Sequence, residues 1–311
     1  MKKMLKISGV LVLVLVVVIV VFFAYLSALP AVPKNYINKV ETGGDIEAKY
    51  LRMGNYEVSY IENGAMQSYE KYEIWYPSEI NESNKKYPVV VFVNGTGVVA
   101  SKYKVLFEHL ASYGFIAIGT EEKYAWNGFS AEMCIRTLLK LNENKEVDGY
   151  PGNPFYNRID MDNIGIVGHS QGGVGVINAI TDTRHSDIYK TAVLLSPTNE
   201  ELATALDWDY DASKVSVPIL LLSSTGAGDE ELVVNLEGLR SIYNHIPATT
   251  EKMMVRRNDA DHGDMLYFSD GYVTAWLMWK LQGDEEAAKA FIGDSAEIEN
   301  NKNYQDINKN F

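Results

Sequence analysis

The pentapeptide GHSQG at 168–172 places Ser170 between small neighbours. An apolar run at 164–167 precedes it and a helical pattern follows, so Ser170 falls on a tight turn from strand to helix. In the pattern G-x-S-x-G, this turn strains the serine backbone and raises the hydroxyl clear of the sheet. A serine in that position can act as a nucleophile. The alternative is a glycine-rich turn that carries no chemistry.

A serine hydroxyl needs a base to take its proton, and the base needs an orienting acid. His262 lies in a loop after the last predicted strand, at the sheet edge where Ser170 also lies. We therefore predict that His262 is the base. The other four histidines fit structural or surface positions: His109, His169, His185 and His245.

The acid is predicted to be Asp229, which follows the buried strand 219–223 and a glycine-containing loop. Asp259 and Asp261 are close to His262 in sequence, but such neighbours seldom reach the correct ring nitrogen. Glu200 is a further alternative. The chain order of serine, acid and histidine is the one described for hydrolases with this strand–turn–helix serine.

Negative charge that develops on a substrate oxygen needs hydrogen-bond donors. The backbone N–H of Gln171 lies at a predicted helix start, and the sharp turn at 94–95 can aim the N–H of Thr96 at the same point. A nucleotide-binding interpretation of 95–97 lacks the G-K-[ST] that should follow it. The alternative for 94–97 is a plain turn.

Strand-like and helix-like segments alternate along the chain, which predicts an α/β fold with a mostly parallel sheet and helices on both faces. The first two strands alternate in polarity and have a short connection, so an antiparallel start is expected. Eight strands are predicted, at 56–61, 71–77, 89–93, 115–120, 164–167, 192–196, 219–223 and 252–255. Helices are predicted at about 101–112, 130–142, 171–182, 230–243 and 271–281.

The segment 56–283 resembles an α/β-hydrolase, most closely the dienelactone-hydrolase-like branch. That branch includes cutinase-like polyesterases, chlorophyllase-type enzymes and platelet-activating-factor acetylhydrolase-like proteins. The resemblance is carried by YPVVVFVNGTG, FIAIGT, NRIDMDNIGIVGHSQGG, AVLLSP, VPILLLSSTGAGDEELV and ADHGDM. It implies the nucleophile, acid and base named above and an oxyanion hole formed by the Thr96 and Gln171 amides. NGTG stands where many relatives have His-Gly, which bears on the substrate rather than on the reaction.

These features predict a serine hydrolase of carboxylic esters that acts through an acyl-enzyme. Alternatives are an acyltransferase or peptidase on the same triad, or a non-catalytic exported binding protein. Residues 197–218 are too few for a large cap domain, so an open site is expected. Tyr124, Trp126 and Phe129 can line an acyl or aromatic subsite. Alternatively, Trp126 and Phe129 pack under their loop.

Composition excludes other classes of function. The 311 residues carry 28 basic and 41 acidic side chains, for a net charge of −13. An acidic surface without a basic patch argues against nucleic acid as a partner. The single Cys134 excludes an intrachain disulfide, and a buried apolar position is expected for it. No metal-binding spacing is present, so neither a metal nor another cofactor is predicted. Nothing in the sequence specifies an oligomeric state.

The first 30 residues differ from the rest of the chain. Lysines precede the uncharged stretch 7–29, which is long enough to span a bilayer as a helix. We predict either a signal anchor that leaves a single-pass protein in the cell membrane with its catalytic domain outside, or a cleaved signal peptide that leaves it secreted. Residues 31–55 are expected to form a linker and lead-in, 56–293 the catalytic domain, and 294–311 a polar, frayed tail.

Overall fold

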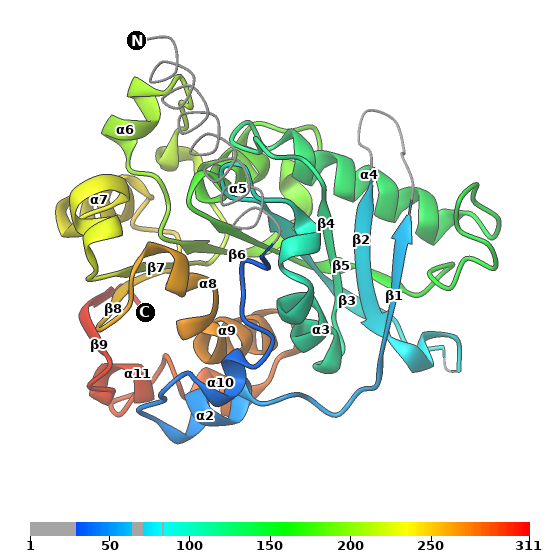
Figure 1. Ribbon diagram of the computed structural model, residues 1–311, viewed down its shortest axis with the longest axis horizontal. Coiled ribbons are helices and arrows are strands. Elements are labelled where there is room, and N and C mark those ends of the chain that lie inside the picture. Colours follow the sequence, from blue (N-terminus) through cyan, green and yellow to red (C-terminus); the bar gives the residue numbers. More distant parts are fainter. Residues whose placement is uncertain (1–28, 64–70, 83) are drawn as a thin grey trace, which may run out of the picture. The chain divides into compact units, whose positions relative to one another are not determined.

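The computed structural model describes residues 29–63, 71–82 and 84–311. The chain divides into two units, 1–31 and 32–311, and the following concerns the second (Figure 1). The membrane span predicted within 1–30 falls on residues that lie, except for the last two, outside the described part. No helix among the residues described is both long and apolar enough to cross a bilayer.

Within the described residues, nine strands form one mixed sheet in the order β1-β2-β4-β3-β5-β6-β7-β8-β9. The six strands from β4 to β8 along this order are parallel to their neighbours, as predicted. The first two pair antiparallel, also as predicted. The strands are β1 (Val58–Asn63), β2 (Tyr72–Pro77), β3 (Tyr87–Val93), β4 (Ile116–Thr120), β5 (Ile159–His169), β6 (Tyr189–Leu195), β7 (Ile219–Ser224), β8 (Lys252–Arg257) and β9 (Tyr304–Lys309).

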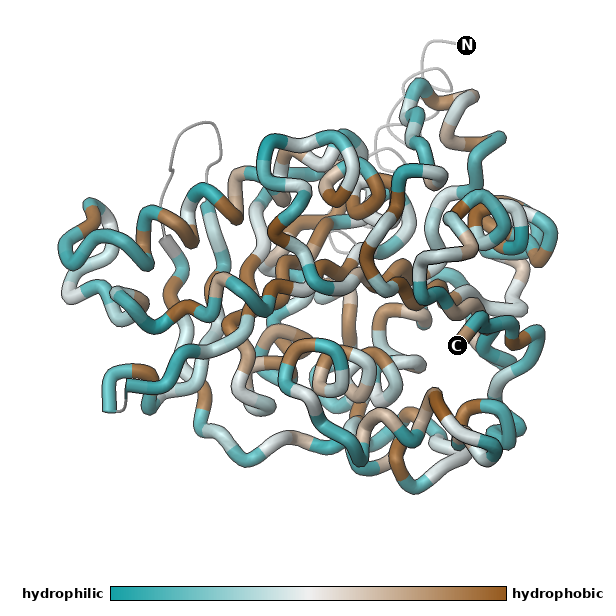
Figure 2. Tube along the Cα trace, turned by 180° about the vertical axis from the view of Figure 1, so that it is seen from behind, coloured by the Kyte–Doolittle hydropathy of each residue, from teal (hydrophilic) through white to brown (hydrophobic). Residues whose placement is uncertain are grey.

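Helices cover both faces of the sheet, which explains why the central strands are continuous apolar runs. Every residue of β3 is buried, and the hydrophobic segments of Figure 2 follow the strands in the middle of the view. On one face lie α3 (Lys104–Ser112) and α9 (Asp270–Gln282). On the other lie α4 (Phe129–Glu143), α5 (Gln171–Thr181) and α7 (Leu236–His245).

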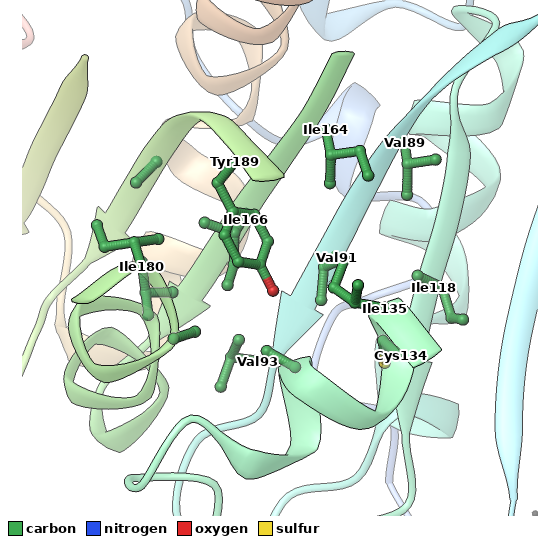
Figure 3. Packing of buried hydrophobic residues seen from close by; sticks show 14 of the residues in the cluster. Val89, Val91, Val93, Ile118, Cys134, Ile135, Ile164, Ile166, Ile180 and Tyr189 are labelled. Carbon is green, nitrogen blue, oxygen red and sulfur yellow. The ribbon is translucent and has the colours of Figure 1, made fainter. Parts of the chain in front are cut away.

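The main core lies between the sheet and the second group of helices. Val91 and Ile166 of neighbouring strands pack there with Ile135 of α4 and Ile180 of α5 (Figure 3). Cys134 is buried in the same core, as predicted. This packing fixes α5, and with it the turn that carries Ser170, against the sheet.

Shorter helices complete the described chain. The α-helices among them are α2 (Asp45–Leu51), α6 (Glu200–Ala205), α8 (Met265–Phe268), α10 (Glu285–Ala288) and α11 (Glu297–Asn300). The 3-10 turns are η1 (Tyr36–Asn38), η2 (Ser78–Asn81), η3 (Ala100–Lys102), η4 (Ser186–Ile188), η5 (Ala212–Lys214) and η7 (His262–Asp264), and η6 (Gly228–Val233) is a π-helix. Between β6 and β7 the chain forms only α6 and η5.

The prediction of eight strands is wrong by one, because the C-terminal segment is ordered rather than frayed. Residues 304–309 form β9, which pairs antiparallel with β8 through Arg257 opposite Tyr304 and Met253 opposite Lys309. An edge strand buries few of its side chains, so a polar sequence can form it. The polar composition of residues 304–309 therefore led to the prediction of a frayed tail.

The segment expected as a linker, 31–55, packs against the domain through a helix. Its α2 contacts α9, and Tyr36, Glu47 and Tyr50 in this segment are each only 1% exposed. Glu297 caps the helix from the far end of the chain, since its carboxylate accepts hydrogen bonds from the N–H groups of residues 46 and 47 at 2.7 and 2.8 Å. The local sequence does not predict this contact, because Glu297 lies 250 residues away from Glu47 along the chain.

Candidate active site

Ser170 joins β5 directly to α5, on the turn that the sequence predicted. Its φ of 58° and ψ of −123° are a conformation that an L-residue adopts only under strain, at a cost of about 1–3 kcal/mol. The strand ends at His169 and the helix begins at Gln171, so a single residue makes the turn. Ser170 is half-buried at this point.

The glycines two positions to either side of Ser170 are required by space. A Cβ atom at Gly168 would lie 2.2 Å from the carbonyl oxygen of Gly172. A Cβ atom at Gly172 would lie 2.1 Å from the carbonyl oxygen of Val93, at the end of β3. Both distances are far shorter than a carbon atom tolerates, so only glycine lets the strand and the helix approach this closely.

His262 and Asp229 meet, although they are 33 residues apart in the chain. The His262 Nδ1 atom lies 2.7 Å from Oδ1 of Asp229. The Asp229 side chain is fully buried and that of His262 is 23% exposed. Because a carboxylate can only accept, Nδ1 carries the proton, and Nε2 of the neutral ring is left as the proton acceptor.

The second oxygen of Asp229 is held by two serines. Its Oδ2 accepts hydrogen bonds from the Ser196 hydroxyl at 2.6 Å, and from the Ser224 amide and hydroxyl at 2.7 Å each. Burial raises the pKa of the Asp229 carboxyl, but the hydrogen bonds from His262, Ser196 and Ser224 outweigh burial and hold that pKa below its usual value. The acid is therefore kept ionised and fixed in orientation.

His169 connects the strand of the serine to the loop of the base. Its Nε2 lies 2.8 Å from the backbone carbonyl oxygen of His262, and the two rings are 4.5 Å apart. Since a carbonyl oxygen accepts, Nε2 of His169 is the donor. Burial and then the neighbouring His262 lower the pKa of His169 to about 3. Within the described chain, the Ser170 hydroxyl makes no hydrogen bond to His262, and His169 provides the link between their two segments.

The segment that carries Thr96 lies against Ser170. A Cβ atom built on Gly95 would be 3.3 Å from the His169 ring and 3.7 Å from Cβ of Ser170. The chain turns here, with Val98 N–H donating to the Gly95 carbonyl at 3.1 Å. Among the residues described, neither the Thr96 nor the Gln171 amide donates a hydrogen bond within the chain. Their role as an oxyanion hole stays a prediction.

Comparison with known families adds to this geometry. Residues 37–306 match the family described as PET hydrolase-like. The chain belongs to the PET hydrolase-like family.

Individual relatives are distant. The chain is 26% identical to cutinase est1 of Thermobifida alba over 191 residues, which are 61% of this chain and 56% of that protein. It is 25% identical to the bis(hydroxyethyl) terephthalate hydrolase of Streptomyces coelicolor over 193 residues, which are 61% of this chain and 54% of that protein. The chain therefore spans little more than half the length of the curated relatives that it matches.

In this PET hydrolase-like chain, the segment from the end of β4 to the first residue of α4 presents aromatic side chains. Tyr124 is 59% and Phe129 41% exposed, while Trp126 is half-buried. The Trp126 carbonyl accepts a hydrogen bond of 2.9 Å from Asn178 of α5, which anchors the segment to the helix that begins at the serine. A role for these three aromatics in binding substrate stays a prediction.

The alternative acids have other partners. Asp261 accepts hydrogen bonds from the N–H groups of His262 and Gly228, and so ties the loop of the base to the helix of Asp229. Glu200 binds His245 at 2.7 Å. Asp259 has a positive φ of 53° in the loop before His262. Of the carboxylates considered, Asp229 is the one bonded to the His262 ring.

Sequence reasoning missed the two serines that hold Asp229. Both stand at the carboxyl ends of neighbouring apolar strands, Ser224 as the last residue of β7 and Ser196 directly after β6. Each is a polar residue at the end of a buried strand, a pattern that is too common to single them out from the sequence alone. The π-helix η6, which carries Asp229, was also missed; such helices are often found at functional sites.

The remaining histidines are bonded elsewhere. Both ring nitrogens of buried His109 are engaged, with Asp270 at 2.9 Å and the Arg52 carbonyl at 2.8 Å. Burial lowers the pKa of His109, but Asp270 more than offsets it and holds that pKa above its usual value. His185 lies 2.9 Å from Glu132. In the described part of the chain, no group of three or more His, Cys, Asp or Glu side chains is placed to hold a metal.

Proposed function

We propose that this protein is a serine hydrolase of carboxylic esters. Ser170 is the nucleophile, His262 the general base and Asp229 the acid that orients it. The observation that carries the proposal is the 2.7 Å contact between the buried Asp229 carboxylate and Nδ1 of His262. The pair is formed by the short helices that follow β7 and β8, and the strained Ser170 directly follows β5.

The reaction follows from the roles of these groups. The Ser170 oxygen attacks the ester carbonyl carbon while His262 Nε2 takes the hydroxyl proton, which it then gives to the departing alcohol. Asp229 stabilises the imidazolium that forms. The Thr96 and Gln171 amides donate to the tetrahedral oxyanion, which typically lowers the barrier by about 3–4 kcal/mol per donor. Water then attacks the acyl-enzyme by the reverse sequence of proton transfers.

The proposed substrates are small or polymeric esters, including aromatic ones. Two features of the chain support this choice. The connection between β6 and β7 is short, so no large cap stands there, and Tyr124, Trp126 and Phe129 lie on the segment after β4. The names of the relatives, a cutinase and a bis(hydroxyethyl) terephthalate hydrolase, agree with it.

Replacing the nucleophile tests the proposal. Ser170→Ala should lower kcat for p-nitrophenyl acetate by about 10⁴-fold or more and abolish labelling by a fluorophosphonate probe, because nothing else supplies the attacking oxygen. The control is Ser213→Ala, which changes an exposed serine on η5 and should leave both readouts unchanged. Undiminished hydrolysis by a folded Ser170→Ala protein would reject the mechanism.

We further propose that the catalytic body is exported and that residues 7–29 tether it to the cell membrane. The support is the uncharged stretch preceded by lysines. Release by signal cleavage is the alternative. Fractionation of cells that express the chain with and without residues 1–28 distinguishes the two.

A further inference from the structure

The residues that follow β4 are fastened to the segments expected to form the oxyanion hole. We call residues 120–125 the β4 loop. Asn94, at the end of β3, is 1% exposed, and its Nδ2 donates to the carbonyls of Thr120 and Glu122 at 2.7 Å each. Asn94 stands two residues before Thr96. The first half of the loop is thereby held beside one of the two expected oxyanion donors.

The second half of the loop is tied in the same way to both donors. The N–H of Gly97, next to Thr96, donates to the Lys123 carbonyl at 2.8 Å. The N–H of Ala125 donates to Oε1 of Gln171 at 2.9 Å. Tyr124 lies between these two tied residues, and its own side chain is 59% exposed.

The loop and α5 pack so closely that no side chain fits between them at Gly175. A Cβ atom on Gly175 would lie 2.2 Å from the Ala125 carbonyl oxygen. Gln171 is fully buried, and its Nε2 has no partner within the described chain; the same holds for Oδ1 of Asn94. Burying a polar atom that the protein does not pair costs free energy, so core packing alone would favour an apolar side chain at both places. The hydrogen bonds that the Asn94 and Gln171 side chains make to the β4 loop explain instead why amide side chains are present at these positions.

We propose that Asn94 and Gln171 are positioning residues that lock the β4 loop to the oxyanion hole, and that Tyr124 is the specificity-determining residue that this lock presents to the substrate. Gln171 has two functions, since its backbone N–H faces the oxyanion and its side chain holds the loop. The selectivity for one ester over another is therefore set by a side chain whose two neighbours are fixed to the catalytic machinery. The inference rests on the proposed esterase function.

The test compares two esters with the same leaving group, p-nitrophenyl acetate and p-nitrophenyl benzoate. Gln171→Met keeps the backbone N–H and removes the acceptor for Ala125. We expect kcat/KM for the benzoate to fall about fivefold more than for the acetate, mainly through KM, as one lost hydrogen bond predicts. Tyr124→Ala should shift the same ratio, and the double variant should add little to either single change.

The control is Tyr156→Ala, which removes another exposed tyrosine, before the amino end of β5, and should leave the ratio unchanged. Gln171→Met with equal losses on both esters, or full additivity in the double variant, would overturn the lock. Tyr124 is exposed, so its alanine variant folds in any case, and an unchanged ratio there would overturn its role in selectivity. A wild-type protein that cleaves neither ester and resists a fluorophosphonate probe would instead reject the proposed function.

Discussion

At the scale of single residues, the site depends on His169 as well as on the triad. This histidine follows Gly168 on β5 and precedes the nucleophile, and its ring donates to the backbone of the base. Because it is buried and neutral, it can donate through one ring nitrogen without placing a second positive charge beside His262. The position next to the serine is therefore used to hold the loop of the base.

His169 also gives the protein a specific sensitivity to acid. Folding lowers the pKa of His169 from 6.5 to about 3. Between these two pH values the imidazole is protonated in the unfolded chain but stays neutral in the folded chain. The stability that the neutral His169 side chain contributes is present above pH 6.5 and is lost as the pH falls from there toward 3. Over this range the free energy of unfolding decreases by about 1.4 kcal/mol per pH unit because of this group. His169→Phe should lack this slope, so its free energy of unfolding should fall less on acidification than that of the wild type.

Urea unfolding at intervals from pH 7 to pH 4 measures this difference. His169→Gln is the matched variant, since it does not titrate but keeps a donor for the His262 carbonyl. It should share the shallower pH dependence of the phenylalanine variant while losing less stability at pH 7. Parallel curves for the wild type and His169→Phe across the range would show that the buried imidazole is not the group responsible.

The triad could be predicted from residue types and order, but its supports could not. Ser170 was marked by its glycines, and Asp229 and His262 by their place after successive strands. Ser196 and Ser224 carry no such mark, because a serine that ends an apolar strand is common and its partner is known only once the two strands are neighbours. Because β6 and β7 are neighbours in the sheet, both serines reach the Asp229 carboxylate and donate to it.

At the scale of elements, the close approach of α5 to the sheet positions the nucleophile. The helix begins immediately after Ser170, and its first turn lies against the end of β3 at Gly172. The same few residues therefore set the strain at the serine and the place of the Gln171 amide. A small displacement of this helix would move both groups together.

Gly172→Ala tests this packing. A methyl group 2.1 Å from a backbone oxygen must push α5 away from β3, so we expect a loss of about 2–3 kcal/mol in the free energy of unfolding and a large fall in kcat. Gly263→Ala is the control, because a Cβ atom there meets nothing within 4 Å, and its stability should stay within about 0.5 kcal/mol of the wild type. Urea melts compare the two. Equal stability of both variants would mean that the helix yields without cost.

Elements differ in how well their sequence predicted them. Strands buried on both faces, such as β3 and β7, are continuous apolar runs and were found close to their observed ends. The strand β9 is polar at most of its positions, the helix α2 is short and lies in a polar segment, and each is stabilised by residues far away in the chain. Tyr304 of β9 donates to Glu47 of α2 at 2.8 Å, a contact that no local pattern can indicate.

At the scale of the whole molecule, residues 32–55 and the C-terminal segment bind each other and the rest of the domain. We call these contacts the clasp. Besides the Tyr304–Glu47 contact, Tyr36 donates to Asp270 at 2.6 Å, and that carboxylate also binds His109 of α3. These contacts join the lead-in to helices on the α9 face of the sheet. Residues 32–55 are thus part of the folded body.

This clasp predicts where the chain can be shortened. A protein that begins at residue 29 keeps every contact described above, so it should hydrolyse p-nitrophenyl acetate with unchanged kcat and appear in the soluble fraction. A protein that begins at residue 55 loses Tyr36, Glu47 and Tyr50, and leaves polar groups such as Asn301 and Tyr304 without their partner Glu47. The urea midpoint of this shortened protein should fall sharply, because each buried donor that loses its acceptor costs about 1–3 kcal/mol of folding stability.

Fractionation of the full-length chain completes the experiment. If residues 7–29 act as an uncleaved anchor, the activity should sediment with membranes and be released by detergent but not by high salt, whereas a cleaved signal peptide would leave it in the medium. Equal stability of the proteins that begin at 29 and at 55 would contradict the clasp without touching the anchor. Soluble, uncleaved full-length protein inside the cell would contradict the anchor and leave the clasp intact, since the two claims depend on separate parts of the chain.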